Sequence, residues 1–269
     1  MTQHIDNICD ERVSLYTDYN EPQLYHLNEP ESGVFIAETP MVIERALNSG
    51  AVPVSFFAQS DALTRDDVIA VLKKAGAVPV FEAQLSVINR ITGFNLTRGL
   101  LAAFMRPEEP DMDSVLDNAK RIVVLEDIVN PTNVGAIFRC AAALGVDGIV
   151  LTRGCTDPYY RRSARVSMGS VFMIPWTYIP KGSDFLGTLH DKGFTVISMA
   201  LSDDAKDIND PELRKNSKRA LVFGSEGDGI SAGTLAGSDH IARIPMQNKV
   251  DSLNVAAASA IAIWELCRT

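Results

Sequence analysis

The chain has 269 residues, a hydrophobic share of 46% and a net charge of −9. This size and composition fit a globular protein with one large domain or two smaller ones, and the acidic balance argues against a nonspecific nucleic-acid binder. No apolar run is long enough to cross a bilayer, and the N-terminus lacks the pattern of a secretion signal. The four cysteines form no Cys-x-x-Cys pair and have no histidine cluster near them. We therefore predict a cytoplasmic protein with free thiols, without zinc or a disulfide framework.

Residues 1–32 are polar and acidic and predict a short helix and a loop. From residue 33 onward, apolar runs alternate with helical patterns. The predicted strands are 34–36, 52–57 and 78–81, the predicted helices are 40–48, 61–75 and 85–91, and a further apolar run covers 99–105. This alternation predicts a small α/β domain over residues 1–107. A segment rich in proline and acidic residues follows, so we expect a linker over residues 108–118.

The second half alternates more regularly. Predicted strands cover 121–125, 148–151, 171–175, 195–199, 220–223 and 240–244. Predicted helices cover 131–144, 159–168, 185–192, 231–236 and 253–267, and the polar stretch 202–218 is either a loop or a helix. Strands that are apolar throughout and separated by helices are typical of a mostly parallel sheet. We therefore predict a second α/β domain over residues 119–269.

The charge is unevenly distributed between these parts. Residues 1–50 contain nine acidic and two basic side chains, whereas between residues 139 and 165 five arginines face two aspartates. The five arginines are Arg139, Arg153, Arg161, Arg162 and Arg165. A basic island of this kind can bind a polyanion locally, but a set of solvated surface arginines explains the charge count equally well.

Three polar segments lie where predicted strands meet helices, which is where α/β proteins usually place ligands. The first begins at Asn130 and ends at Arg139. Asn130 can cap the helix and Pro131 suits its first turn. A capped helix with one solvated arginine explains these residues, but it explains Asn133 and Gly135 less well, because both are poor helix formers inside the predicted helix.

The second segment is the glycine loop 224–229, directly after a predicted strand. Such a loop lets a ligand approach the backbone closely. It has neither the lysine of a phosphate-binding loop nor the spacing of a dinucleotide fingerprint. By itself it is more typical of a plain turn.

The third segment runs from Ile244 to Val255 and leads into the last helix. Ser252 is a candidate N-cap for that helix, and Asn254, one residue inside it, is an isolated polar residue before a nearly continuous apolar run. A helix that is apolar on almost all sides must be buried on most of them. Burial against a second subunit is a reasonable explanation in a domain of this size.

Together the three segments resemble the motifs of the SpoU (TrmH-like) family of the SPOUT superfamily, a family of RNA ribose 2′-O-methyltransferases. The segment 133–139 resembles the first family motif, the glycine loop the second, and 244–255 the third, and their order, spacing and flanking strands agree. One departure is Asn248, which stands where the family usually has glycine in the cofactor loop.

The resemblance implies a fold that periodicity does not predict. The C-terminal domain is expected to form a trefoil knot, which is very rare in proteins. The N-terminal domain is similar to the family's ribosomal-protein-L30e-like substrate-binding domain, through Phe35–Glu38 and Val42–Ala46. Family members bind S-adenosylmethionine in the knot and dimerise there. The implied cofactor is therefore S-adenosylmethionine, without a metal, and the implied assembly is a homodimer.

The implied reaction moves the sulfonium methyl group to a ribose 2′-hydroxyl by in-line displacement. The implied catalytic residues are Arg139, Asn133, Glu226, Ser252 and Asn254, with Asn133 and Glu226 holding Arg139. Because arginine is almost always charged, we favour a role for Arg139 in orienting the hydroxyl and its phosphate over a role as base. The residues implied at the cofactor are Phe223, Gly224, Gly229, Ile244, Met246 and Leu253. The basic island, including Arg139, Arg153, Arg161, Arg162 and Arg165, becomes a candidate contact to the RNA backbone.

Three function classes follow from the sequence. The first is methyl transfer to structured RNA, for which the N-terminal domain favours 23S ribosomal RNA over transfer RNA. The second is a non-catalytic RNA-binding member of the fold, and the intact polar residues of the motifs argue against it. The third is a dinucleotide-dependent enzyme on an ordinary doubly wound sheet. The lack of Gly-x-Gly-x-x-Gly after the first strand argues against this third class.

Overall fold

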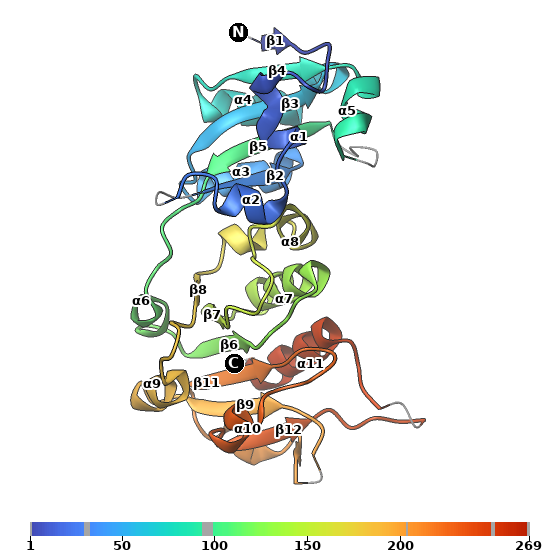
Figure 1. Ribbon diagram of the computed structural model, residues 1–269. Coiled ribbons are helices and arrows are strands. Elements are labelled where there is room, and N and C mark those ends of the chain that lie inside the picture. The colour runs from blue at the N-terminus through green and yellow to red at the C-terminus, as the bar shows by residue number, and fades with distance from the viewer. Residues whose placement is uncertain (1, 30–32, 93–98, 203, 249–250, 268–269) are drawn as a thin grey trace. The chain divides into compact units, whose positions relative to one another are not determined.

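The computed structural model describes residues 2–29, 33–92, 99–202, 204–248 and 251–267. The chain divides into two compact units (Figure 1). One comprises Met1–Glu108 with Tyr159–Phe172, and the other comprises Glu109–Pro158 with Met173–Thr269. The N-terminal unit therefore includes a segment from the second half of the chain. Among the described residues, no helix is both long and apolar enough to cross a membrane.

The N-terminal unit is built on a five-stranded sheet in the order β1-β4-β3-β5-β2. The strands are β1 (Thr2–His4), β2 (Val34–Glu38), β3 (Pro53–Gln59), β4 (Val80–Ala83) and β5 (Leu100–Met105), and the helices include α1 (Ser14–Thr17), α2 (Glu21–Tyr25), α3 (Pro40–Asn48), α4 (Asp66–Ala75) and α5 (Leu85–Thr92). Strands β1, β3 and β4 run parallel, whereas β5 runs antiparallel to β2 and β3. The sequence did not predict β1, because this edge strand is short, polar and exposed.

Aromatic stacking attaches the segment 159–172 to this unit. The ring of Phe35 on β2 stacks on Phe104 at a centroid distance of 5.3 Å and on Tyr159 at 5.0 Å. Tyr159 in turn stacks on Phe172 at 5.3 Å. Helix α8 (Arg161–Val166) lies between these two aromatic residues in the chain and packs against β2.

The predicted strand over 171–175 is wrong. Residues Ser170–Phe172 form a 3-10 turn, and the strand β8 covers Trp176–Tyr178 instead. Gly169, with φ +81°, turns the chain at the end of α8. The apolar side chain of Phe172 is then used in the aromatic stack of the N-terminal unit. An apolar run therefore marked a buried segment correctly but not its secondary structure.

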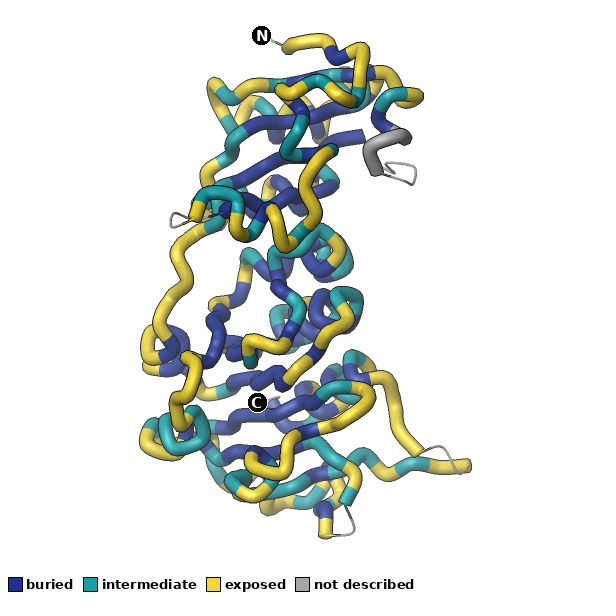
Figure 2. The backbone as a smooth tube through the Cα atoms, in the orientation of Figure 1, coloured by how far each residue is buried: buried dark blue, intermediate teal, exposed yellow. Residues whose placement is uncertain are grey.

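The C-terminal unit is built on a seven-stranded sheet in the order β10-β12-β9-β11-β6-β7-β8. Its other strands are β6 (Arg121–Leu125), β7 (Gly148–Leu151), β9 (Thr195–Met199), β10 (Lys206–Asp207), β11 (Arg219–Phe223) and β12 (His240–Arg243). All pairings are parallel, which confirms the predicted type of sheet. Figure 2 shows the central strands β6 and β11 as buried, apart from the first residue of β6. The strand β10 was not predicted because it has only two residues inside a polar stretch.

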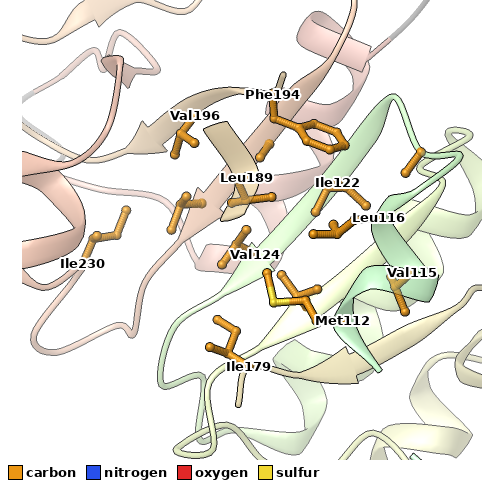
Figure 3. Packing of buried hydrophobic residues seen from close by; sticks show 14 residues of the cluster. Met112, Val115, Leu116, Ile122, Val124, Ile179, Leu189, Phe194, Val196 and Ile230 are labelled. Carbon is orange, nitrogen blue, oxygen red and sulfur yellow. The ribbon is translucent and has the colours of Figure 1, made fainter. Parts of the chain in front are cut away.

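Helices cover both faces of this sheet. The helices α6 (Met112–Leu116) and α9 (Phe185–Asp191) pack on one face through Leu116 and Leu189, which meet Ile122 and Val124 of β6 (Figure 3). Val123 and Leu125 of β6 must point to the opposite face, and they are fully buried as well. There α7 (Pro131–Ala143) and α11 (Val255–Cys267) pack against each other, and α11 contacts β11.

Candidate active site

One edge of the parallel sheet collects the polar segments that the sequence singles out. Strand β11 lies between β6 and β9, and β12 lies beyond β9. Because the carboxyl ends of parallel strands meet at one edge, the segments after β9, β11 and β12 converge there. They line a pocket of about 580 Å³, which falls within the range of about 300–1,000 Å³ typical of small-molecule sites.

All six residues predicted to contact a cofactor line this pocket. They are Phe223, Gly224, Gly229, Ile244, Met246 and Leu253. Of the predicted catalytic residues, Glu226, Ser252 and Asn254 also line it. The pocket further includes Met199, Ala200 and Leu201, which the sequence did not single out. A signal existed, because Met199 ends the predicted strand 195–199 and the other two residues follow it, but only the strand order places them beside β11.

The glycine loop after β11 is closed on itself. The backbone N–H of Ser225 donates to the carbonyl of Gly229 at 3.1 Å, and the N–H of Gly229 donates back at 3.2 Å. A side chain at Gly224 would lie 2.1 Å from the Gly229 carbonyl oxygen, so no other residue fits there without a shift. Gly229 has φ +70°, a conformation that favours glycine. These constraints fix the loop that presents Glu226.

Three side chains from three motifs form one hydrogen-bonded group. The Asn133 side-chain amide donates to Glu226 Oε1 at 2.7 Å. The Asn254 amide donates to the same oxygen at 2.7 Å and to Asn133 Oδ1 at 3.1 Å. Asn133 is buried on α7, so its polar group needs these partners. The group explains why a poor helix former is placed inside this helix.

The N-cap of the last helix is Asn254 rather than Ser252. Helix α11 begins at Val255, and the Asn254 side-chain oxygen accepts a hydrogen bond from the backbone N–H of Ala256 at 2.9 Å. The prediction that Asn254 lies inside the helix is therefore wrong by one position. In the cap position its amide group remains available to Asn133 and Glu226. At the other helix, Asn130 accepts from the N–H of Thr132 at 2.9 Å, which confirms the predicted cap of α7.

The departure at Asn248 has a structural reason. Asn248 has φ +58°, which lies in the left-handed region where glycine is most at ease and asparagine is the best-tolerated alternative. The residue therefore keeps the turn that a glycine would make. The next two residues of this predicted motif, 249 and 250, lie outside the described residues.

Arg139 stands apart from the hydrogen-bonded group. Its side chain is exposed on α7. Within the part of the chain that the structure describes, it makes no hydrogen bond or ion pair, so the expectation that Asn133 and Glu226 hold it is not met. A guanidinium without a partner in the described part of the protein presents its donors to solvent.

Two other arginines of the basic island donate to carboxylates through their side chains, and a third does so through its backbone. The Arg153 guanidinium donates to both oxygens of Glu109, at 3.0 and 2.6 Å, and lies 4.5 Å from the centre of the Tyr178 ring. Arg165 donates to the buried Glu38 at 3.5 Å. The backbone N–H of Arg161 donates to the Glu21 carboxylate at 2.8 Å. The side chain of Arg162 is exposed.

The thiols of Cys155 and Cys140 are poor nucleophiles. Burial raises the pKa of Cys155 to about 11, and its thiol donates to the carbonyl of Leu125 at 3.3 Å. Burial also raises the pKa of Cys140, although neighbouring Arg139 opposes the shift. Since the thiolate is the reactive form, neither cysteine is suited to covalent catalysis. Among the described residues, no group of three or more potential ligand side chains is arranged to hold a metal ion.

Comparison with known proteins places this geometry in context. The model of the SpoU rRNA methylase family matches residues 120–264. An uncharacterised tRNA/rRNA methyltransferase of Mycobacterium bovis is 35% identical over 271 residues, covering 98% of this chain and 92% of the relative. The 23S rRNA (guanosine(2553)-2′-O)-methyltransferase RlmP of Bacillus subtilis is 25% identical and covers 88% of this chain and 89% of its own length.

Solved structures share the fold over nearly the whole chain. An AdoMet-bound rRNA methyltransferase from Sinorhizobium meliloti matches with a TM-score of 0.80 at 24% identity, covering 98% of this chain and 97% of that one. The SpoU methyltransferase AviRb from Streptomyces viridochromogenes, solved with AdoMet, matches with a TM-score of 0.79 at 20% identity, covering 95% and 97%. These matches confirm the predicted fold, a trefoil-knot methyltransferase domain preceded by a smaller α/β domain.

Proposed function

Because this chain belongs to the SpoU rRNA methylase family, we propose that it transfers a methyl group from S-adenosylmethionine to a ribose 2′-hydroxyl of 23S ribosomal RNA. The observation that carries this proposal is the hydrogen-bonded group of Asn133, Glu226 and Asn254 beside the pocket. Each of its members comes from a different family motif. A protein with this fold but without transfer activity would not require the two asparagine amides and the Glu226 carboxylate to meet.

The pocket suits S-adenosylmethionine. Its apolar lining includes Phe223, Ile244 and Leu253, while Gly224 exposes backbone groups because no side chain fits there. Such a combination of apolar surface and a few fixed polar groups is typical of small-molecule sites. When bound, S-adenosylmethionine supplies a methyl group on a positively charged sulfur.

The polar residues then divide into two roles. Glu226 fixes the two asparagine amides and, together with Ser252, forms the polar wall of the pocket. Arg139 orients the attacking ribose through its phosphate, because a planar guanidinium binds phosphate oxygens with two parallel hydrogen bonds. The methyl–sulfur bond breaks as the methyl–oxygen bond forms and the 2′-hydroxyl proton is released, and an in-line displacement of this kind depends strongly on such positioning.

We propose that the RNA backbone binds to the exposed face of α8. Arg161 and Arg162 begin this helix, within the N-terminal unit. Two relatives, RlmP and the RlmB of Vibrio parahaemolyticus, which is 30% identical over 162 residues, are named as 23S rRNA 2′-O-methyltransferases. They support ribosomal over transfer RNA. An RNA substrate and free cysteines also support a cytoplasmic location.

We further propose a homodimer that buries the outer face of α11. Ile261 is 41% exposed and Trp264 is 55% exposed on this helix. Exposed aromatic and aliphatic side chains on one helix face mark interaction surfaces. Sedimentation should therefore give twice the mass of the chain, and Trp264→Glu should shift the protein toward the monomer. A monomeric wild-type protein would contradict this assembly.

Two experiments test the function. Titration calorimetry should show binding of S-adenosylmethionine to the purified protein. Incubation with methyl-labelled cofactor and total RNA, followed by nucleoside mass spectrometry, should show label in a 2′-O-methylated nucleoside of 23S rRNA. Label in transfer RNA alone would reject the ribosomal substrate, and cofactor binding without any transfer would reject the catalytic function.

A further inference from the structure

The glutamate that follows the strand β6 lies in an unusual position. Glu126 follows Leu125 directly and is only 8% exposed. Its backbone N–H donates to the carbonyl of Phe223 at 2.9 Å, which extends the pairing of β6 with β11 by one residue. Its side chain then accepts a hydrogen bond at Oε1 from the backbone N–H of Ser231 at 3.2 Å.

These two bonds hold both ends of the loop that carries Glu226. Phe223 is the last residue of β11 before the loop, and Ser231 lies two residues after Gly229, the last residue of the loop, and caps the short helix α10 (Ala232–Ala236). Within the loop, Ser225 and Gly229 are bonded to each other. Glu126, just after the neighbouring strand, thus holds both ends of the loop that contributes Glu226 to the hydrogen-bonded group.

The chain after Glu126 is also fixed. Asp127 adopts φ +54°, and its backbone N–H donates to Thr152 Oγ1 at 2.9 Å, while the Thr152 hydroxyl donates back to the Asp127 carboxylate at 2.6 Å. This local conformation is costly for a residue other than glycine. Three residues later Asn130 caps α7, the helix that carries Asn133. Glu126 therefore precedes the first motif in the chain and is bonded to residues on both sides of the second.

We propose that Glu126 is a positioning residue that sets the place of Glu226 relative to Asn133, and thereby governs methyl transfer. This inference rests on the proposed function of the site. Glu126 is not among the pocket-lining residues, so it acts through the loop and not on a ligand. It is not needed as a helix cap, because the Ser231 hydroxyl itself accepts from the N–H of Thr234 at 3.2 Å.

The role depends on one acceptor atom and not on charge. The other carboxylate oxygen, Oε2, is buried and has no hydrogen-bond partner among the described residues. Glu126→Gln keeps an acceptor for the Ser231 N–H and nearly the same shape, whereas Glu126→Ala removes it. We expect Glu126→Ala to lower the transfer rate by about 10- to 100-fold, the effect of a small misplacement in a positioned site, and Glu126→Gln to stay within about threefold.

A matched pair at Ser231 tests the same bond from the donor side. Ser231 has φ −60°, which proline adopts readily. Ser231→Pro removes the N–H and the hydroxyl, while Ser231→Ala removes the hydroxyl alone. We expect Ser231→Pro to lose transfer as Glu126→Ala does, with Ser231→Ala retaining it. The double variant Glu126→Ala, Ser231→Pro should be no worse than either single variant, because both remove one interaction.

Amide hydrogen exchange of Ser231 in the free protein checks the bond without cofactor or RNA. Protection should be lost in Glu126→Ala and kept in Glu126→Gln, with thermal unfolding confirming that each variant is folded. Wild-type transfer rates in Glu126→Ala or Ser231→Pro would overturn the inference, as would loss of transfer in Glu126→Gln with Ser231 still protected. If the wild-type protein transfers no methyl group, the proposed function itself fails, and the positioning role fails with it.

Discussion

The two helices that carry arginines of the basic island, α7 and α8, differ in what holds them. Helix α7 is tied by an uncharged side chain, because the Asn133 amide donates to Glu226 at 2.7 Å, while Arg139 on the same helix has no partner among the described residues. Helix α8 is tied by an arginine, because Arg165 donates to Glu38 at 3.5 Å. The same residue type thus has a structural bond on one helix and an open guanidinium on the other.

This difference teaches which arginines of a basic island are available to a ligand. Arg153 and Arg165 direct hydrogen-bond donors to carboxylates of the protein itself, so their positive charge is partly balanced before RNA arrives. Arg139 keeps its charge and its fork of donors for a phosphate. We therefore rank Arg139 first among the five for catalysis and regard Arg153 and Arg165 as mainly structural.

The largest effect should come from Arg139→Ala. We expect methyl transfer to fall by about 100- to 1,000-fold, as when one transition-state donor is removed, with unchanged affinity for S-adenosylmethionine in calorimetry. Arg139→Lys serves as the matched control, because it keeps the charge but loses the planar fork. We expect Arg139→Lys to recover only part of the activity. Full activity in Arg139→Ala would remove the contrast between the two helices.

The second-largest effect should come from breaking the hydrogen bond that holds α7. Glu226→Ala removes the acceptor shared by the Asn133 and Asn254 amides and leaves a buried amide without its partner. We expect transfer to fall by about 10- to 100-fold. Glu226→Gln is the control, since its carbonyl oxygen can still accept both bonds. Equal rates for the two variants would show that the carboxylate charge, and not the hydrogen bonding, is what matters at this position.

A smaller effect is expected from the double variant Arg161→Ala, Arg162→Ala. RNA affinity should fall several-fold, and the slope of log affinity against log salt should decrease by about one to two, roughly one for each phosphate that the protein no longer binds. Filter binding at several salt concentrations measures both. Binding of S-adenosylmethionine should not change. An unaltered salt slope would argue that α8 does not contact the RNA backbone.

The smallest functional effect should come from breaking the bond between Arg165 and Glu38 that holds α8. Arg165→Met removes the partner of Glu38, whose side chain is only 1% exposed. Because a buried carboxylate without a partner is unfavourable, we expect the unfolding temperature to fall by a few degrees, at about 2–4 °C for each kcal/mol lost. Glu38→Gln with Arg165→Met should recover part of the loss. A large decrease in RNA affinity with unchanged stability would instead place Arg165 at the RNA.

Local patterns in the sequence were sufficient to predict much of the architecture. The apolar runs of β6, β7, β9, β11 and β12 predicted a parallel sheet, because such strands are buried on both faces. The resemblance to the SpoU family, and not the apolar pattern, supplied the six predicted cofactor residues, all of which line one pocket. Where the pattern was weak, as in the polar strands β1 and β10, prediction from the sequence failed.

Only the tertiary structure decided the contacts between distant parts of the chain. Asn133 meets Glu226 across 93 residues and Asn254 across 121, and no local pattern encodes such pairings. The segment 159–172 has the composition of a basic helix and an apolar strand, yet aromatic stacking on Phe35 places it in the N-terminal unit. The sequence alone determined which residues stand at the ends of strands, since burial of apolar side chains sets that periodicity. Which of these residues are bonded, and which arginine stays open, depended on the path of the chain that brings strand ends together.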